Sequence, residues 1–482
     1  NNGDGDFTFN RDSSATRIGQ NGLIETVGFF GSELVTNGTF DTNLNNWNVT
    51  LAGQTIEWDN GSVKYITDGA LAFLEQTITT VVGKVYRATV DINVTSGNLA
   101  LSIGGQEVSG DGVQTLEMLF TATGTSTVFQ LKRKPGAAAS GFFDNATFKE
   151  VTGDQPRLNY EVNNGAVQSC PSLLLEPTST NLVLNSATGT YGNSPGSELI
   201  TTAPDGTNTA IIPIPNSNSD RYEYTINGGS YATGTKLTYS WYSKQISVPV
   251  GAYVGNLLAQ VLINVTQVGS NIKVKDSING WAKYSATFNI TDGSLQSKIR
   301  LYFGNAVGVG NQSVAYWGHQ LEVLTYCTSL IPTYGVIQTR AAEICKDAGN
   351  VATFNDSEGV LFTESKVFIN ESDSKRITLS DGSTNNRVVI AFEDSSIKVV
   401  IASGGSTVFN NSISGIDTTL IHKVAVKYKA NDFALWVDGT ERLTDTTGAT
   451  PIGLLELAFD NGNGVNYFYG NTKDLRIYNE AL

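Results

Sequence analysis

Short runs in which apolar and polar residues alternate are the feature that most constrains this chain. Four examples are Val85–Ile92, Gln114–Phe120, Lys236–Ser243 and Trp281–Phe288. A period of two puts alternate side chains on opposite faces of a β-strand. Gly-rich turns separate the runs, which is typical of antiparallel sandwiches. We therefore predict an all-β chain with several antiparallel β-sandwich or jelly-roll domains in tandem.

The composition limits the partners that we expect. The chain has 482 residues, which is enough for about three or four domains. Its 31 basic and 45 acidic residues give a net charge of −14, which disfavours binding to nucleic acid or to an acidic membrane surface. Because no run of 18 apolar residues occurs, we expect no membrane insertion.

Three cysteines, Cys170, Cys327 and Cys345, are an odd number at low density. We expect small buried thiols rather than a disulfide framework. A disulfide between Cys170 and Cys327 stays an open alternative, because these two residues flank the same predicted domain.

Several short segments, dispersed along the chain, form a second feature. The central one, Cys170–Leu182, contains the apolar run Leu173–Leu175, which is typical of a buried strand and is closed by Pro177. The order of these segments and the residues in them resemble a pattern that recurs in bacteriophage tail-fibre and other virion-appendage proteins. Its other members are Asp6–Arg17, Gly22–Ile24, Pro156–Tyr160, Gln320–Glu322, Thr328–Thr333 and Thr339–Ala342.

This resemblance implies a domain organisation in which one domain is inserted into another unit. The family pattern brings residues 1–32 and 153–176 close together in sequence, so these two ranges are expected to form one collar-like unit. The remaining parts are an inserted jelly roll at 33–152, a second jelly roll at 177–326, a linker at 327–350 with a possible short helix at Ala341–Ala348, and a last sandwich at 351–482.

The predicted sandwiches resemble known modules. Glu33–Asp41 and Phe142–Val151, at the two ends of the inserted domain, resemble a carbohydrate-binding-module or galactose-binding-like jelly roll. Residues 177–326 repeat the same plan. Lys423–Tyr428 and Asp474–Leu482 resemble parts of a laminin-G-like, concanavalin-type lectin domain.

Sequence motifs for catalysis are largely absent. The two histidines, His319 and His422, are far apart in sequence, and no H-E-x-x-H, G-x-S-x-G or phosphate-binding motif occurs. Glycosidases on concanavalin-type folds need paired carboxylates, and the nearest approach, Glu57–Ser62, lacks the last one. We therefore predict a protein that is not an enzyme, and a catalytic pair assembled from distant residues stays open.

Aromatic residues are the candidates for glycan binding, because sugar rings stack on exposed aromatic faces. The candidates are Trp47, Trp58, Tyr65, Trp241, Tyr242 and Trp436. The alternative is that these rings are core residues, since an aromatic on an alternating strand usually packs inward. For Trp281, Trp317 and Trp436 the core interpretation is favoured.

One metal site follows from the resemblance. The family's sandwich often holds a structural Ca²⁺, with one carboxylate after the opening Phe and another in the closing strand. Asp41 and Asp144 stand at the matching positions, and carboxylate oxygens suit Ca²⁺. The alternative is two solvated carboxylates in turns.

Together these features favour a structural virion protein of a bacteriophage, a fibre or appendage subunit that displays lectin-like domains for host or environmental glycans. The resemblance implies a homotrimer, with other virion proteins and glycans on a bacterial surface as further partners. The location would be the surface of the phage particle, or extracellular if the protein is not viral. Two alternatives stay open, a secreted or surface polysaccharide-active enzyme with carbohydrate-binding modules and a purely structural decoration protein.

Overall fold

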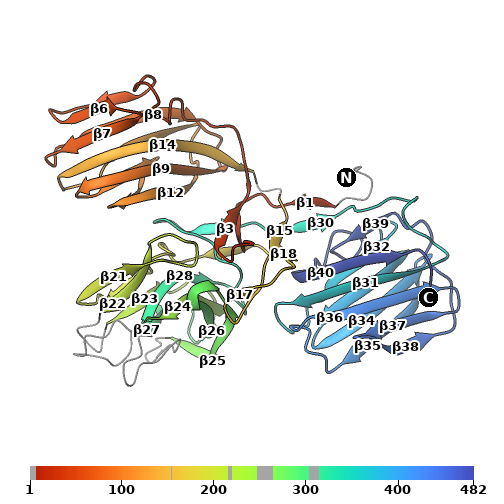
Figure 1. Cartoon of the computed structure of the whole chain (residues 1–482). Helices are drawn as coiled ribbons and strands as arrows, with labels where there is room; N and C mark the ends of the chain where they lie inside the picture. The colour runs from red at the N-terminus through yellow and green to blue at the C-terminus, as the bar shows by residue number, and fades with distance from the viewer. Residues whose placement is uncertain (1–6, 153–154, 215–219, 247–263, 303–313, 482) are drawn as a thin grey trace.

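The regular secondary structure of the described residues consists almost entirely of β-strands (Figure 1). The computed structural model describes residues 7–152, 155–214, 220–246, 264–302 and 314–481. Within these ranges no α-helix forms, and the only helical turn is the 3-10 turn at Ile278–Gly280. The all-β prediction is therefore confirmed. No helix of this described part is long and apolar enough to cross a membrane.

The first sandwich consists of two antiparallel sheets. In the five-stranded sheet the order is β11 (Gln106–Gly110), β10 (Leu99–Ile103), β13 (Ser126–Arg133), β8 (Phe73–Thr79) and β5 (Asn48–Thr50). In the facing sheet the order is β12 (Val113–Thr121), β9 (Val85–Ser96), β14 (Ala139–Thr152), β7 (Ser62–Thr67) and β6 (Thr55–Asp59). The short β4 (Phe29–Phe30) pairs with the end of β14.

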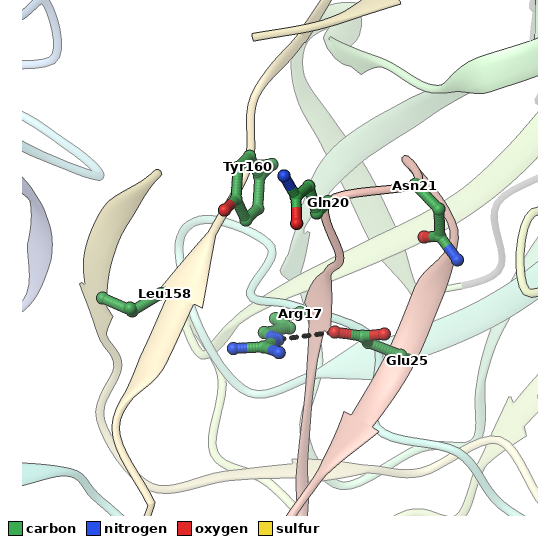
Figure 2. Close-up of a pocket in the computed structure, with 6 residues that line it drawn as sticks. All are labelled: Arg17, Gln20, Asn21, Glu25, Leu158 and Tyr160. Carbon is green, nitrogen blue, oxygen red and sulfur yellow. Dashed lines mark hydrogen bonds and ion pairs between the residues drawn. The ribbon is translucent and has the colours of Figure 1, made fainter. Parts of the chain in front are cut away.

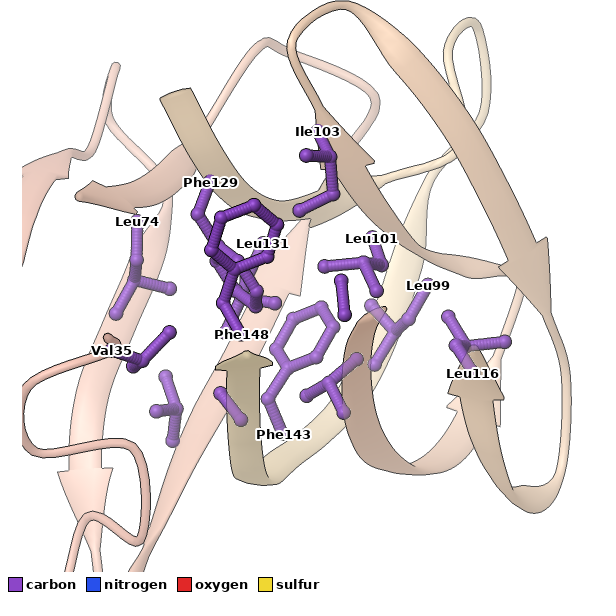
Figure 3. Close-up of a cluster of buried hydrophobic side chains, with 14 of the residues drawn as sticks. Val35, Leu74, Leu99, Leu101, Ile103, Leu116, Phe129, Leu131, Phe143 and Phe148 are labelled. Carbon is purple, nitrogen blue, oxygen red and sulfur yellow. The ribbon is translucent and has the colours of Figure 1, made fainter. Parts of the chain in front are cut away.

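A β-bulge sets the core of this sandwich (Figure 3). Phe143 and Phe148 are five residues apart, so a regular strand would point them to opposite faces. The register of β14 shifts between Asp144 and Thr147, and Asn145 has a φ of 50°. The bulge absorbs one residue, so both rings reach the core, where Phe148 meets Phe129 edge to face. Asp144 is left on the outer face.

The strands that enter and leave the first sandwich run side by side. Phe30 of β4 pairs with Val151 of β14, and the backbone N–H of Gly31 donates to the carbonyl of Glu150. An inserted domain needs adjacent ends of this kind. Gly153 and Asp154 lie outside the described residues, and the domain boundaries stay a prediction.

The second sandwich pairs a six-stranded sheet with a three-stranded one. The larger sheet runs β21 (Ser197–Thr201), β22 (Ala210–Ile214), β28 (Val314–Glu322), β24 (Lys236–Gln245), β26 (Ala282–Ile290) and β25 (Val265–Asp276). The smaller sheet runs β20 (Tyr191–Asn193), β23 (Arg221–Ile226) and β27 (Ser297–Tyr302). Aromatic side chains dominate the core between them, including Tyr222, Tyr239 and Trp241.

The third sandwich shares one sheet with the predicted collar. Its five-stranded sheet runs β35 (Ser406–Ser414), β34 (Ser396–Ser403), β33 (Arg387–Glu393), β32 (Lys375–Ser380) and β39 (Glu456–Ala458). The other sheet runs β15 (Arg157–Asn159), β18 (Ser172–Leu175), β40 (Gly470–Tyr478), β31 (Glu358–Val367), β36 (His422–Lys429), β37 (Phe433–Val437) and β38 (Thr440–Asp445). The run Leu173–Leu175 therefore is a strand, and it extends a sheet made by the C-terminal part of the chain.

Some of the other collar segments pair with distant strands, and others form local hairpins. β1 (Thr8–Asn10) pairs with β30 (Ile344–Lys346), and β19 (Ser179–Asn181) pairs with β29 (Gln338–Arg340). β2 (Ala15–Ile18) and β3 (Ile24–Val27) form a hairpin, as do β16 (Val162–Asn163) and β17 (Ala166–Val167). The possible short helix at Ala341–Ala348 is wrong, because β30 occupies its centre and its Cys345 is buried in the third core. All three cysteines are free, with Cys170 exposed.

Five buried charged side chains, which we call the junction network, tie these segments together: Arg11, Arg157, Glu176, Arg340 and Glu343. Glu343 binds Arg11 at 2.6 Å and also Arg157. Glu176 binds Arg157 at 2.8 Å and Arg340 at 2.9 Å. The five side chains come from four segments, since Arg340 and Glu343 are three residues apart, and the outermost members, Arg11 and Glu343, are separated by 332 residues. The network therefore joins the two ends of the collar pattern.

Hydrogen bonds complete the network. Ser329 donates to the Glu176 carboxylate through its backbone N–H at 2.7 Å and its hydroxyl at 2.6 Å. Glu343 accepts the backbone N–H of Glu176 at 2.9 Å. Burial by itself would raise the pKa of Glu176, but the charges of Arg340 and Arg157 and the Ser329 bonds outweigh it and hold this pKa far below its ordinary value. Both carboxylates are therefore satisfied in spite of their burial.

The substitution Glu343→Gln tests the network. It leaves Arg11 and Arg157 buried without their carboxylate, and breaking a buried ion pair costs about 3–5 kcal/mol. We expect that loss in the free energy of unfolding of the full chain, measured by urea denaturation. The exposed Glu441 gives the matched control, since Glu441→Gln should change the free energy by less than about 0.5 kcal/mol. Equal effects of the two substitutions would contradict a central role for the network.

Candidate functional site

A groove lies on the outer face of the first sandwich, across the sheet formed by β12, β9, β14, β7 and β6. The alternation that sends Ile92 into the core turns Asp91 and Asn93 outward. The bulge in β14 turns Asp144 to the same side. This sheet-face groove has a volume of about 500 Å³, and its main lining residues are Asp59, Asn60, Ser62, Asp91, Asn93, Val113, Phe142 and Asp144.

The groove combines acidic and amide groups with a small apolar surface. Asp91 accepts hydrogen bonds from the hydroxyl of Thr115 at 2.5 Å and the amide of Asn145 at 3.0 Å. Val113 is 80% exposed, and Phe142 is half-buried. No Lys or Arg is among the lining residues. The site therefore suits ligands that offer hydroxyl groups or positive charge, and it disfavours anions.

Asp144 has an unusual environment within this groove. Partial burial raises its pKa above the ordinary value, and the charges of Asp91 and Asp41 raise it further. The backbone N–H of Asn145 donates to its Oδ1 at 2.7 Å, which lowers the pKa but does not offset the increase. The charged form of Asp144 is thus less stable than it would be in water, and a hydrogen-bond donor or a cation would offset this cost.

The predicted calcium ligands, Asp41 and Asp144, interact through their charges. Asp41 also accepts the hydroxyl of Thr39 at 2.9 Å. Ca²⁺ takes six to eight oxygen ligands, and in the described part of the chain no group of three or more His, Cys, Asp or Glu side chains is arranged to hold a metal. The two carboxylates could supply only part of a coordination shell, so the calcium site stays a prediction.

Most of the predicted sugar-binding aromatics lie inside the protein. Trp47 and Tyr65 are in the core of the first sandwich, and Trp241 and Tyr242 are buried in the second. Each ring is covered by protein, so the geometry does not support stacking on a sugar. The physical reason is that alternation on a half-buried strand puts large aromatics on the core face.

The exposed tryptophans are Trp58, at 42% exposure, and Trp436, at 39%. Trp58 donates its indole N–H to the carbonyl of Phe40 at 2.7 Å and pairs with the core residue Val63, so its ring lies on the core side of β6, opposite the groove residue Asp59. Trp281 and Trp317 are buried as the sequence indicated. The core interpretation of Trp436 is wrong, because this residue points outward from β37.

Sequence reasoning missed Asp91, Asn93, Val113 and Phe142 as members of a site. Their outward direction could be deduced from the period of two in β9 and β12. The order of the strands in the sheet could not be deduced from the sequence. This order brings Asn93 of β9 next to Val113 of β12 and Phe142 of β14.

A second groove lies on the collar, between the hairpin of β2 and β3 and the edge strand β15 (Figure 2). It is open and has a volume of about 570 Å³. Arg17 and Glu25 form an ion pair at 2.7 Å across the hairpin. The side chains of Gln20, Leu158 and Tyr160 line the rest. This hairpin groove is a second polar hollow with an aromatic wall.

Comparisons with known proteins yield no family for the chain. No family model matches it, and no curated protein matches. The solved structures that are similar over part of it include the following three. The first, described as "CBM4 structure and function", is 18% identical, with a TM-score of 0.22, and the match covers 24% of this chain and 99% of that one.

The other two structures match longer parts of the chain. The N-terminal CBM22-1-CBM22-2 tandem domain from Paenibacillus barcinonensis Xyn10C is 10% identical, with a TM-score of 0.21, covering 61% of this chain and 98% of that one. The LG1-3 region of the laminin alpha2 chain is 10% identical, with a TM-score of 0.17, covering 86% and 96%. TM-scores this low leave the function to be argued from the groove geometry.

Calcium binding can be tested through Asp144. If Asp41 and Asp144 hold Ca²⁺, added Ca²⁺ should raise the melting temperature of the chelator-treated full chain. At a free Ca²⁺ concentration one hundred times the dissociation constant, the gain in the free energy of unfolding is about 2.7 kcal/mol. Asp144→Asn should abolish this response. The measurement is a calorimetric melting curve with chelator and with Ca²⁺.

If Asp41 and Asp144 do not hold Ca²⁺, the dependence of stability on pH and the effect of Asp144→Asn should differ. Without calcium, the raised pKa of Asp144 means that its contribution to stability is greatest at low pH and is lost as the pH rises through that pKa. Asp144→Asn would then stabilise the protein at neutral pH, and Ca²⁺ would not shift the melting temperature of either form.

Proposed function

We propose that this protein is a non-enzymatic, glycan-binding subunit of a bacteriophage fibre or appendage, located on the surface of the particle. The observation that carries the glycan-binding part is the sheet-face groove. It offers carboxylates and amides beside exposed apolar groups, on a sheet face that no other part of the described chain covers at Asn93 and Val113.

The chemistry of a neutral saccharide fits this groove. Its hydroxyl groups would donate to Asp59, Asp91 and Asp144, and Asn93 would both donate and accept. The apolar C–H face of a sugar ring would pack on Val113 or Phe142.

The virion part of the proposal is supported by the collar pattern. Four members of the junction network also belong to the sequence segments of that pattern: Arg11, Arg157, Glu176 and Arg340. The pattern thus has a structural purpose, which is to join three sandwiches into one subunit. An appendage protein needs such rigid joints to hold its binding modules away from the particle.

A polysaccharide-active enzyme is the second candidate, and one observation favours it. Glycosidases use a protonated carboxyl as acid and an ionised carboxylate as base or nucleophile. Asp144, with its raised pKa, shares the groove with Asp59 and Asp91. The release of reducing ends from bacterial and algal polysaccharides would support this candidate and overturn the non-enzymatic proposal. A decoration protein without ligands would bind no glycan at all.

Glycan binding is tested on an array of bacterial and algal glycans with the full chain. We expect Asn93→Ala and Asp59→Asn each to weaken binding by about tenfold, equivalent to about 1.4 kcal/mol, because each removes a hydrogen-bonding group. The exposed Asp12 on the collar provides a control, and Asp12→Asn should bind like the unmodified chain. Equal binding by all three variants would contradict a role for the groove.

We also propose a homotrimer, with other virion proteins as further partners. The collar segments are short, and a net charge of −14 makes copies of the chain repel each other, so association requires apolar contact. Light scattering at micromolar concentration should give three times the chain mass of 51.5 kDa. A stable monomer at that concentration would contradict obligate trimerisation.

A further inference from the structure

A third hollow, the interdomain cleft, lies where the first sandwich, the β2–β3 hairpin and the second sandwich meet. Its volume is about 460 Å³, within the range of about 300–1,000 Å³ that is typical of small-molecule sites. The first sandwich contributes Arg87 and Glu117, the hairpin contributes Glu25, and the second sandwich contributes Asp205 and Trp317. Each of these three parts therefore forms one wall.

The walls are held in place by contacts that do not depend on a ligand. Arg87 and Glu117 form a two-point ion pair, at 2.8 and 2.6 Å, between β9 and β12. The backbone N–H of Ile24 in β3 donates to the carbonyl of Pro204 at 3.0 Å. This bond holds the loop that carries Asp205 against the hairpin. The cleft is thus built before any ligand binds.

The charges in the cleft indicate the ligand class. Glu117 is paired with Arg87, and Glu25 is paired with Arg17 at 2.7 Å. Asp205 is held by the hydroxyl and the backbone N–H of Thr207, through Oδ1. Burial raises the pKa of Asp205, and the charge of Glu117 contributes to the same direction. Three carboxylates against one lining guanidinium disfavour an anionic ligand.

Hydroxyl groups, aliphatic side chains and two aromatic rings make up most of the remaining lining. Trp317 donates its indole N–H to the hydroxyl of Thr209 at 3.0 Å, so the ring is fixed in the wall. Tyr334 also lines the cleft and packs against the core of the first sandwich. Trp317 is itself buried, so Tyr334 provides the aromatic surface of the cleft. Acidic acceptors beside an aromatic surface match a ligand with hydroxyl groups on its edges and apolar faces.

We propose that the interdomain cleft binds a neutral oligosaccharide, at a site separate from the sheet-face groove. The ligand's hydroxyl groups donate to the carboxylates of Asp205 and Glu117, and its apolar face lies toward the half-buried Tyr334. Because the walls belong to different parts of the chain, the bound saccharide connects the first sandwich to the second. Binding then stabilises their relative position in addition to providing affinity.

Two substitutions test the cleft. Asp205→Asn keeps the oxygen that accepts from Thr207 and removes the charge. Ala187→Phe puts a large ring into the cleft from the second sandwich. The matched control is the groove variant Asn93→Ala, which lies further along the same outer face of β9 and outside the cleft lining.

The measurement is isothermal titration calorimetry of the full-length variants with cellotriose, maltotriose, xylotriose and triacetylchitotriose. We expect at least one of the four to bind, with affinity about tenfold weaker in Asp205→Asn and lost in Ala187→Phe. Binding should persist in Asn93→Ala. Circular dichroism of each variant confirms that it is folded, and either cleft variant is sufficient for the comparison.

Other outcomes overturn the proposal in distinguishable ways. No heat from any of the four sugars at about 10 mM, a concentration that detects millimolar affinity, would reject a saccharide site. Binding that is lost in Asn93→Ala but kept in both cleft variants would support the sheet-face groove and reject the cleft. Binding of spermidine alone, abolished by Asp205→Asn, would make the cleft a cation site and reject the saccharide.

Discussion

The junction network is the interaction on which the rest of the architecture depends. Removing a charge from water costs several kcal/mol, and a buried pair is stable only when opposite charges and hydrogen bonds surround each group. Arg157 and Glu176 meet this condition because Glu343, Arg340 and Ser329 arrive from distant parts of the chain. The network therefore adds little net stability compared with apolar packing, and it specifies one arrangement of the segments.

The sheets around the network follow from that arrangement. With Arg157 and Glu176 fixed, β15 and β18 lie along the edge of the third sandwich's sheet and pair with β40. The β2–β3 hairpin is held to the same place, because Arg157 donates to the carbonyl of Thr16 at 2.8 Å. This hairpin is a wall of both the hairpin groove and the interdomain cleft. The positions of these hollows thus depend on buried charges that line neither of them.

The sheet-face groove depends on a different constraint, the bulge in β14. Phe143 and Phe148 both need the core, and the extra residue that reconciles them sets the position of Asp144 on the outer face. The same bulge places Asn145 so that its side-chain amide donates a hydrogen bond to Asp91. Core packing therefore determines the shape of the polar surface. A regular strand with the same composition would move one phenylalanine into water and change which carboxylates face the groove.

The sequence by itself determined the local structure. A period of two in residues such as Tyr86–Ile92 specifies which side chains face the core, and Leu173–Leu175 reads as a strand, since both depend on neighbours along the chain. Only the tertiary structure decided which strands are adjacent and that Ile344–Lys346 forms a strand rather than a helix. It also decided the burial of four aromatic residues: Trp47, Tyr65, Trp241 and Tyr242. Strand order, bulges and the meeting of Arg11 with Glu343 depend on contacts between residues far apart in sequence, which a local pattern does not encode.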